Sequence, residues 1–102
     1  MSDLPTQPFH FIVRFTPKEG RADAFRQIMI DTAVISRQEP ACLGSDLFES
    51  IHEPKEFSLH SVWVDEDAFE LHASLPHTER FIEASKELLT HEIKGLRLRK
   101  IG

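Results

Sequence analysis

The sequence predicts a single α+β domain in which helices cover one face of a four-stranded antiparallel sheet. Three observations predict this fold. The chain has 102 residues, which is enough for one hydrophobic core. Four segments have the pattern of strands, and two longer regions have the three-and-four spacing of amphipathic helices. These segments follow one another in the order strand, helix, strand, strand, helix, strand.

The first strand and the first helix have the clearest patterns. Residues 9–15 alternate, and the face that we expect to pack on the core carries Phe9, Phe11, Val13 and Phe15. Apolar residues then recur at helical spacing from Arg21 to about Arg37, and Pro40 follows the end of this helix. Residues 1–8 contain two prolines and few apolar side chains, so we expect a flexible N-terminal arm before a domain that spans residues 9–102.

The second half of the chain completes the predicted sheet. We expect strands over residues 43–51, 57–64 and 93–101, and a helical region after Asp65 that Pro76 kinks or restarts. Gly44 indicates a β-bulge or a close approach of two backbones. The basic residues of the last segment should form the solvated side of its strand. Two strand–helix–strand units with right-handed crossovers give the ferredoxin-like βαββαβ arrangement.

The sheet face that carries no helices is partly apolar. Three apolar side chains lie on it among polar ones, namely Ile12, Val62 and Val64. Such a face favours a partner, and two sheets packed face to face would make a dimeric barrel, so we expect a homodimer. His10 and His60 should meet on this face near Arg14. They would form either a hydrogen-bonded interface pair or a pH-sensitive contact.

Composition excludes several classes of function. The formal net charge of -5 and the pI of about 5.6 argue against a general affinity for nucleic acid or anionic membranes. The single cysteine, Cys42, cannot form an internal disulfide, which fits a reducing compartment, and we interpret it as a buried small residue. The sequence has no apolar run of ~18 residues and no signal-peptide pattern. We therefore expect a cytoplasmic protein that does not span a membrane.

Residues 57–77 resemble the signature region of the antibiotic biosynthesis monooxygenase family. A strand ends in Trp63, an acidic helix start follows, and His72 lies nine residues beyond the tryptophan, with His77 shortly after it. Residues 39–44 are similar to the turn before the family's second strand, and residues 11–25 to its first strand, turn and helix. The resemblance covers roughly residues 9–101.

The resemblance implies a dimeric α+β barrel with a pocket between sheet and helices in each subunit. It also implies a cofactor-independent monooxygenase that oxidises a small hydroxyaromatic or quinol-type compound, with O2 as the co-substrate. The sequence departs from the family at Ala41, where Gly is usual, and at Ser61, where Glu is frequent. The second change removes a candidate base. The Asn-Trp-His set of the haem-degrading branch is not apparent, so we do not expect haem degradation.

Oxygenation without a cofactor needs an apolar pocket, a base and a donor for the developing oxyanion. His72 is the candidate base or orienting group, Trp63 the pocket wall and N–H donor, and Ser61 a weak donor in place of the usual carboxylate. The candidate substrate-binding residues are Phe11, Phe25, Met29, Leu59 and Phe69. The simpler interpretation is that His72 is a buried, hydrogen-bonded histidine and that Trp63 belongs to the core.

The sequence does not predict a metal site. His72 and His77 are five residues apart with Pro76 between them, and no carboxylate lies at a matching spacing. We expect no metal and no cofactor, and we expect His77 to cap the restarted helix. Two other functions stay open: a small-ligand-binding or stress-related dimer without activity, and an isomerase or decyclase acting on a small oxygenated metabolite. The latter would need several polar groups that converge with His72.

Overall fold

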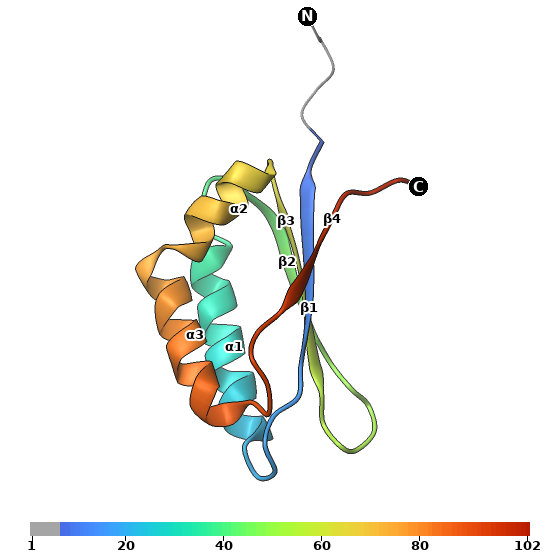
Figure 1. The fold of residues 1–102 in the computed structure, drawn as a ribbon, viewed down its shortest axis with the longest axis vertical. Helices are drawn as coiled ribbons and strands as arrows, with labels where there is room; N and C mark the ends of the chain where they lie inside the picture. The colour runs from blue at the N-terminus through green and yellow to red at the C-terminus, as the bar shows by residue number, and fades with distance from the viewer. Residues whose placement is uncertain (1–6) are drawn as a thin grey trace, which may run out of the picture.

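The computed structural model describes residues 7–102 and confirms the predicted α+β fold. Within this range the elements are β1 (Phe9–Phe15), α1 (Ala22–Ser36), β2 (Cys42–Glu49), β3 (Phe57–Trp63), α2 (Glu66–Ala73), α3 (Pro76–Leu88) and β4 (Gly95–Leu98). The four strands form an antiparallel sheet in the order β2-β3-β1-β4. The helices lie together on one side of this sheet (Figure 1). Most of the expected N-terminal arm, residues 1–6, lies outside the described residues.

The core forms where the predicted apolar faces of β1 and α1 meet. Val13 and Phe15 of β1 are 2% and 1% exposed, and Phe25 of α1 is fully buried. α1 starts at Ala22 because Gly20, with a φ of 78°, turns the chain in a conformation that other residues rarely adopt. Most of the apolar area that stabilises the domain is buried in this layer between sheet and helices.

Local signals place the boundaries around α2 and α3. The Asp65 carboxylate accepts a hydrogen bond from the backbone N–H of Ala68 at 2.8 Å, which caps the start of α2. Pro76 restarts the chain as α3, since a proline in the first turn of a helix loses no hydrogen bond. The bulge expected at Gly44 is confirmed by a register shift between Cys42 and Gly44 in the β2–β3 pairing. No helix among residues 7–102 is long and apolar enough to cross a membrane.

The last strand is shorter than predicted. Its apolar side chains lie on the uncovered sheet face, and one of its basic side chains faces the helices. Leu96 and Leu98 are 63% and 37% exposed and lie on the sheet face that carries no helices. Arg97 points to the helix side, where it pairs with carboxylates of α2 and lies 5.3 Å from the ring centre of Phe69. Arg97 is therefore not only a solvated residue, because it also covers part of the apolar layer.

The uncovered sheet face brings the two predicted histidines together. The rings of His10 and His60 lie side by side, with Nδ1 of the first 2.9 Å from Nε2 of the second. Arg14, on the same face, binds the Glu56 carboxylate at 2.6 Å. In addition to the apolar side chains that the sequence predicts on this face, the structure exposes Phe48, Leu96 and Leu98 there.

Candidate active site

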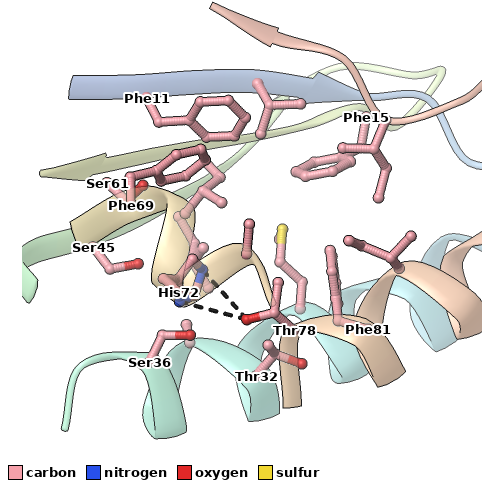
Figure 2. Close-up of a pocket in the computed structure, with 18 of the residues that line it drawn as sticks. Phe11, Phe15, Thr32, Ser36, Ser45, Ser61, Phe69, His72, Thr78 and Phe81 are labelled. Carbon is pink, nitrogen blue, oxygen red and sulfur yellow. Dashed lines mark hydrogen bonds between the residues drawn. The ribbon is translucent and has the colours of Figure 1, made fainter. Parts of the chain in front are cut away.

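A cavity of about 130 Å³ lies between the sheet and the helices. Its walls come from β1, β2 and β3 on one side and from all three helices on the other, with Ile93 at the edge. Figure 2 shows the rings of Phe11 and Phe15 on the sheet side and the hydroxyl groups of Thr32, Ser36 and Thr78 on the helix side, while Ser45 and Ser61 reach the cavity from the strands. Most of the lining is apolar, and the polar side chains that reach it are Thr32, Ser36, Ser45, Ser61, His72 and Thr78.

The cavity brings together all but one of the predicted site residues. Those that line it are His72, Trp63, Ser61, Phe11, Met29, Leu59 and Phe69. Phe25 is not among the lining residues, because it is fully buried between the rings of Phe15, Phe57 and Phe81. Phe25 and Met29 share one face of α1, so helical spacing could not separate the core residue from the cavity residue.

His72 is held in place by contacts on two sides. Its ring packs against the Trp63 indole with a centroid distance of 4.3 Å, and only 14% of its side chain is exposed. Its Nδ1 lies 2.7 Å from Oε2 of Glu39. A carboxylate oxygen can only accept, so Nδ1–H donates and Nε2 keeps the lone pair of a neutral ring. Burial lowers the pKa of His72 below the ordinary 6.5, although the bond to Glu39 opposes this shift.

Glu39 and His77 are functional candidates that sequence reasoning missed. Glu39 lies in the turn after α1, 33 residues before His72, and its Oε2 also accepts a hydrogen bond from Nε2 of His77 at 2.8 Å. The prediction that His77 caps α3 is wrong, because the N-cap residue is Leu75 and no side chain caps this end. No carboxylate lies at a matching spacing in the sequence, but Glu39 binds both histidines through tertiary structure, which no local spacing reveals.

Thr78 is a further polar group beside His72. Its Oγ1 lies 3.4 Å from Nδ1 and 3.5 Å from Nε2 of the histidine, as the dashed lines in Figure 2 mark. Thr78 is 9% exposed and lines the cavity. The nitrogen that carries the free lone pair is thus next to a hydroxyl group of the cavity wall.

The roles expected of Trp63 and Ser61 are altered by a bond between them. The indole N–H of Trp63 donates to Oγ of Ser61 at 3.1 Å, and both residues are almost fully buried. The indole is therefore a wall of the cavity whose N–H is already engaged. Because the Ser61 oxygen accepts this bond, its own O–H is left to donate to another group.

This arrangement provides three of the elements that acid–base chemistry on a small aromatic molecule requires. The neutral ring of His72, oriented by a carboxylate, can act as a base, in the manner of other base–carboxylate pairs. The hydroxyl groups can donate hydrogen bonds to a developing oxyanion. The mostly apolar lining suits an aromatic ring. The volume is close to the ~150 Å³ of an apolar cavity that holds one benzene molecule, so the space fits a single ring.

Comparisons with known proteins agree with the fold. Among curated proteins none matches the chain. The crystal structure of PA3566 from Pseudomonas aeruginosa is similar, with 27% identity, a TM-score of 0.88 and coverage of 97% of this chain and 99% of that chain. The structure of Rv0793 from Mycobacterium tuberculosis is 26% identical, with a TM-score of 0.86 and coverage of 93% and 96%.

A third crystal structure, named antibiotic biosynthesis monooxygenase, has the same fold with 21% identity, a TM-score of 0.84 and coverage of 92% of this chain and 99% of that chain. The sequence model of the family with this description matches residues 8–84. That segment includes every element of the fold up to most of α3 and each residue found at the cavity except Ile93. The chain therefore belongs to the antibiotic biosynthesis monooxygenase family.

Proposed function

We propose that this protein is a monooxygenase that oxidises a single-ring hydroxyaromatic compound, such as a quinol, with O2 and without metal, flavin or haem. The observation that carries the proposal is His72, which lines an apolar cavity while Glu39 binds the opposite nitrogen of its ring. Membership of the family supports the class of reaction. The substrate class rests on the size and lining of the cavity.

The reaction needs no external reductant when the substrate is a quinol. Nε2 of His72 removes a phenolic proton, and the resulting electron-rich anion reduces O2. One oxygen atom enters the ring to give a hydroxyquinone, and the other leaves as water. The quinol supplies all four electrons that reduce the two oxygen atoms, so the atoms and electrons balance. Ser61 and Thr78 are placed to donate hydrogen bonds to the oxygen atoms of the ring.

The cavity volume supports one of the substrate classes that the family resemblance implies. About 130 Å³ accommodates one aromatic ring with its substituents. A three-ring anthrone would need the helices to move away from the sheet, which would break packing that stabilises the core. A single-ring quinol is therefore the substrate class that we propose.

An isomerase or decyclase is the second candidate. The specific observation in its favour is the convergence of polar groups at His72. Glu39 and Thr78 lie within hydrogen-bonding distance of the His72 ring, and His77 lies within hydrogen-bonding distance of Glu39. This convergence also argues against a purely passive binding protein, whose pocket would need no oriented base. An isomerase would use the same base and would consume no oxygen.

We further propose that the protein works as a homodimer that buries the uncovered sheet face. This face carries exposed apolar side chains of β2 and β4 beside the His10–His60 pair. The cavity lies on the opposite side of the sheet, so each subunit would keep its own site. Twofold dimers are the commonest form of assembly.

Oxygen uptake tests the proposed activity. Chelator-treated protein is incubated with one-ring quinols, two-ring hydroxynaphthalenes and three-ring anthrones, and uptake is compared with the spontaneous rate of each compound. The proposal expects catalysed uptake that chelator does not change and that is greatest for one-ring compounds. Absence of catalysed uptake from folded protein contradicts it and favours the isomerase, which the same panel of compounds would reveal as a spectral change without oxygen consumption.

A further inference from the structure

Three side chains from separate elements converge beside the cavity. Glu39 follows α1, His72 lies on α2 and His77 lies in the first turn of α3. Each offers one ligand atom, and the three atoms all lie within 4.8 Å of one another. Both ring nitrogens face the same carboxylate oxygen, at 2.7 and 2.8 Å. The side chains are only 12–15% exposed, so packing holds them near this arrangement.

The donor set is one that first-row transition metals prefer. Two imidazole nitrogens with one carboxylate oxygen form the protein ligands of many zinc and non-haem iron sites, whereas Mg²⁺ and Ca²⁺ favour oxygen ligands. Within residues 7–102 the ion-pair partners of the Glu39 carboxylate are the two histidines.

From this geometry we infer that Glu39, His72 and His77 bind a divalent first-row transition-metal ion, for which Zn²⁺ is the probe. Ligands at about 2.1 Å from a tetrahedral ion are about 3.4 Å apart. The nitrogens of His72 and His77, now 2.7 and 2.8 Å from the carboxylate oxygen, must therefore withdraw from it by about 0.7 and about 0.6 Å. The two nitrogens, which lie within 4.8 Å of each other, must reach the same separation of about 3.4 Å. Water or another small ligand would complete the coordination, with Thr78 beside it.

Metal binding changes the protonation of the histidine rings without a net loss of protons. A ligating nitrogen must carry its lone pair, so the proton on Nδ1 of His72 moves to Nε2, and the proton on Nε2 of His77 moves to Nδ1. His72 then presents an N–H donor next to Thr78 instead of a base. If the proposed function is correct, the ion therefore inhibits turnover. The binding inference itself does not depend on that function.

Zinc affinity measured by competition with a chromophoric chelator tests the site. The protein is untagged, stripped of metal and desalted. We expect one Zn²⁺ per chain, and we expect His77→Gln and Glu39→Gln each to weaken binding by about tenfold or more. Circular dichroism checks that the variants are folded. Absence of stoichiometric binding by folded wild-type protein overturns the inference.

The matched control removes the other close histidine pair. His60→Ala leaves the three proposed ligands unchanged. It eliminates the contact between His10 and His60 on the opposite sheet face. Its zinc affinity should equal that of the wild type. If affinity falls in His60→Ala and persists in His77→Gln, the ion binds on the sheet face and the inference is wrong.

A spectroscopic readout needs no variant of the site. Long-range ¹H–¹⁵N spectra of the histidine rings report which nitrogen carries the proton. Stoichiometric Zn²⁺ should move the proton of His72 from Nδ1 to Nε2, and an unchanged tautomer would contradict ligation through Nδ1.

Oxygen uptake measured in parallel separates the two proposals. Zinc binding with the tautomer change but without inhibition would contradict the base role of His72, while uninhibited turnover without zinc binding would contradict only the metal site.

Discussion

At the scale of single residues, the proposed base His72 is held by a carboxylate that does not line the cavity. Glu39 is not among the cavity-lining residues, yet its bond to Nδ1 fixes the ring and its tautomer. We predict that Glu39→Gln lowers kcat by about 10²-fold or more, within the ~10²–10⁴-fold range of general-base catalysis, and leaves KM nearly unchanged. Steady-state kinetics of metal-free protein measure both constants.

The control for this prediction is Glu49→Gln. Glu49 binds Arg26 at the surface and lies away from the cavity, so its replacement should change neither constant. A Glu39→Gln variant with a raised KM and a normal kcat would show that Glu39 shapes substrate binding and does not position the base.

Cys42 gives a pH-dependent prediction. Burial raises the pKa of its thiol above the ordinary value, and a hydrogen bond with the backbone of Gly44 only partly opposes this. Because the thiolate is the reactive form, alkylation by iodoacetamide should be slower than for a model thiol at every pH below the raised pKa. The rate should still be rising steeply at pH about 8.5, where a free thiol is half ionised. A plateau by that pH would contradict the partly buried environment of Cys42.

Sequence patterns identify some residues of the candidate site and not others. His72 and Trp63 stand at a characteristic separation along the chain, so a family pattern finds them. Glu39 and Thr78 reach His72 only because α1, α2 and α3 pack together. Phe25 lies outside the cavity lining, and its pattern does not show this, because depth within a packed layer is not encoded in helical spacing.

At the scale of elements, β4 approaches the sheet closely at Gly95. A Cβ added there would overlap the ring of Phe11, which lines the cavity. We predict that Gly95→Ala lowers the free energy of unfolding by about 1–3 kcal/mol, as overpacking usually does, and reduces the cavity. Urea denaturation measures the first effect. Gly44→Ala is the control, because its Cβ meets nothing within 4 Å, and equal effects of the two changes would contradict this account.

Element boundaries follow the sequence where a local signal exists. Pro76 marks the start of α3, and Asp65 caps α2. The last strand has no such signal. Its alternation continues to residue 101, but pairing stops at Leu98 opposite His10, near the start of β1. A strand ends where its partner ends, which is information that the segment itself does not contain.

At the scale of the whole molecule, the uncovered sheet face should control assembly. Leu96 is 63% exposed on this face, so Leu96→Lys would place a charge in the proposed interface and raise the dimer dissociation constant by about tenfold or more. Sedimentation equilibrium measures this constant. Leu71→Lys is the matched control, because Leu71 is 65% exposed on α2, away from the face. Equal effects of both changes, or a monomeric wild type, would contradict the proposed dimer.

The central claim is that His72 is the base of a cofactor-free oxygenation. The most direct test compares oxygen uptake with a one-ring quinol by chelator-treated wild type, His72→Ala and the surface control His52→Ala. We predict that His72→Ala falls to the spontaneous rate while its fold and oligomeric state are unchanged, and that His52→Ala keeps the wild-type rate. Undiminished uptake by folded His72→Ala would contradict the account.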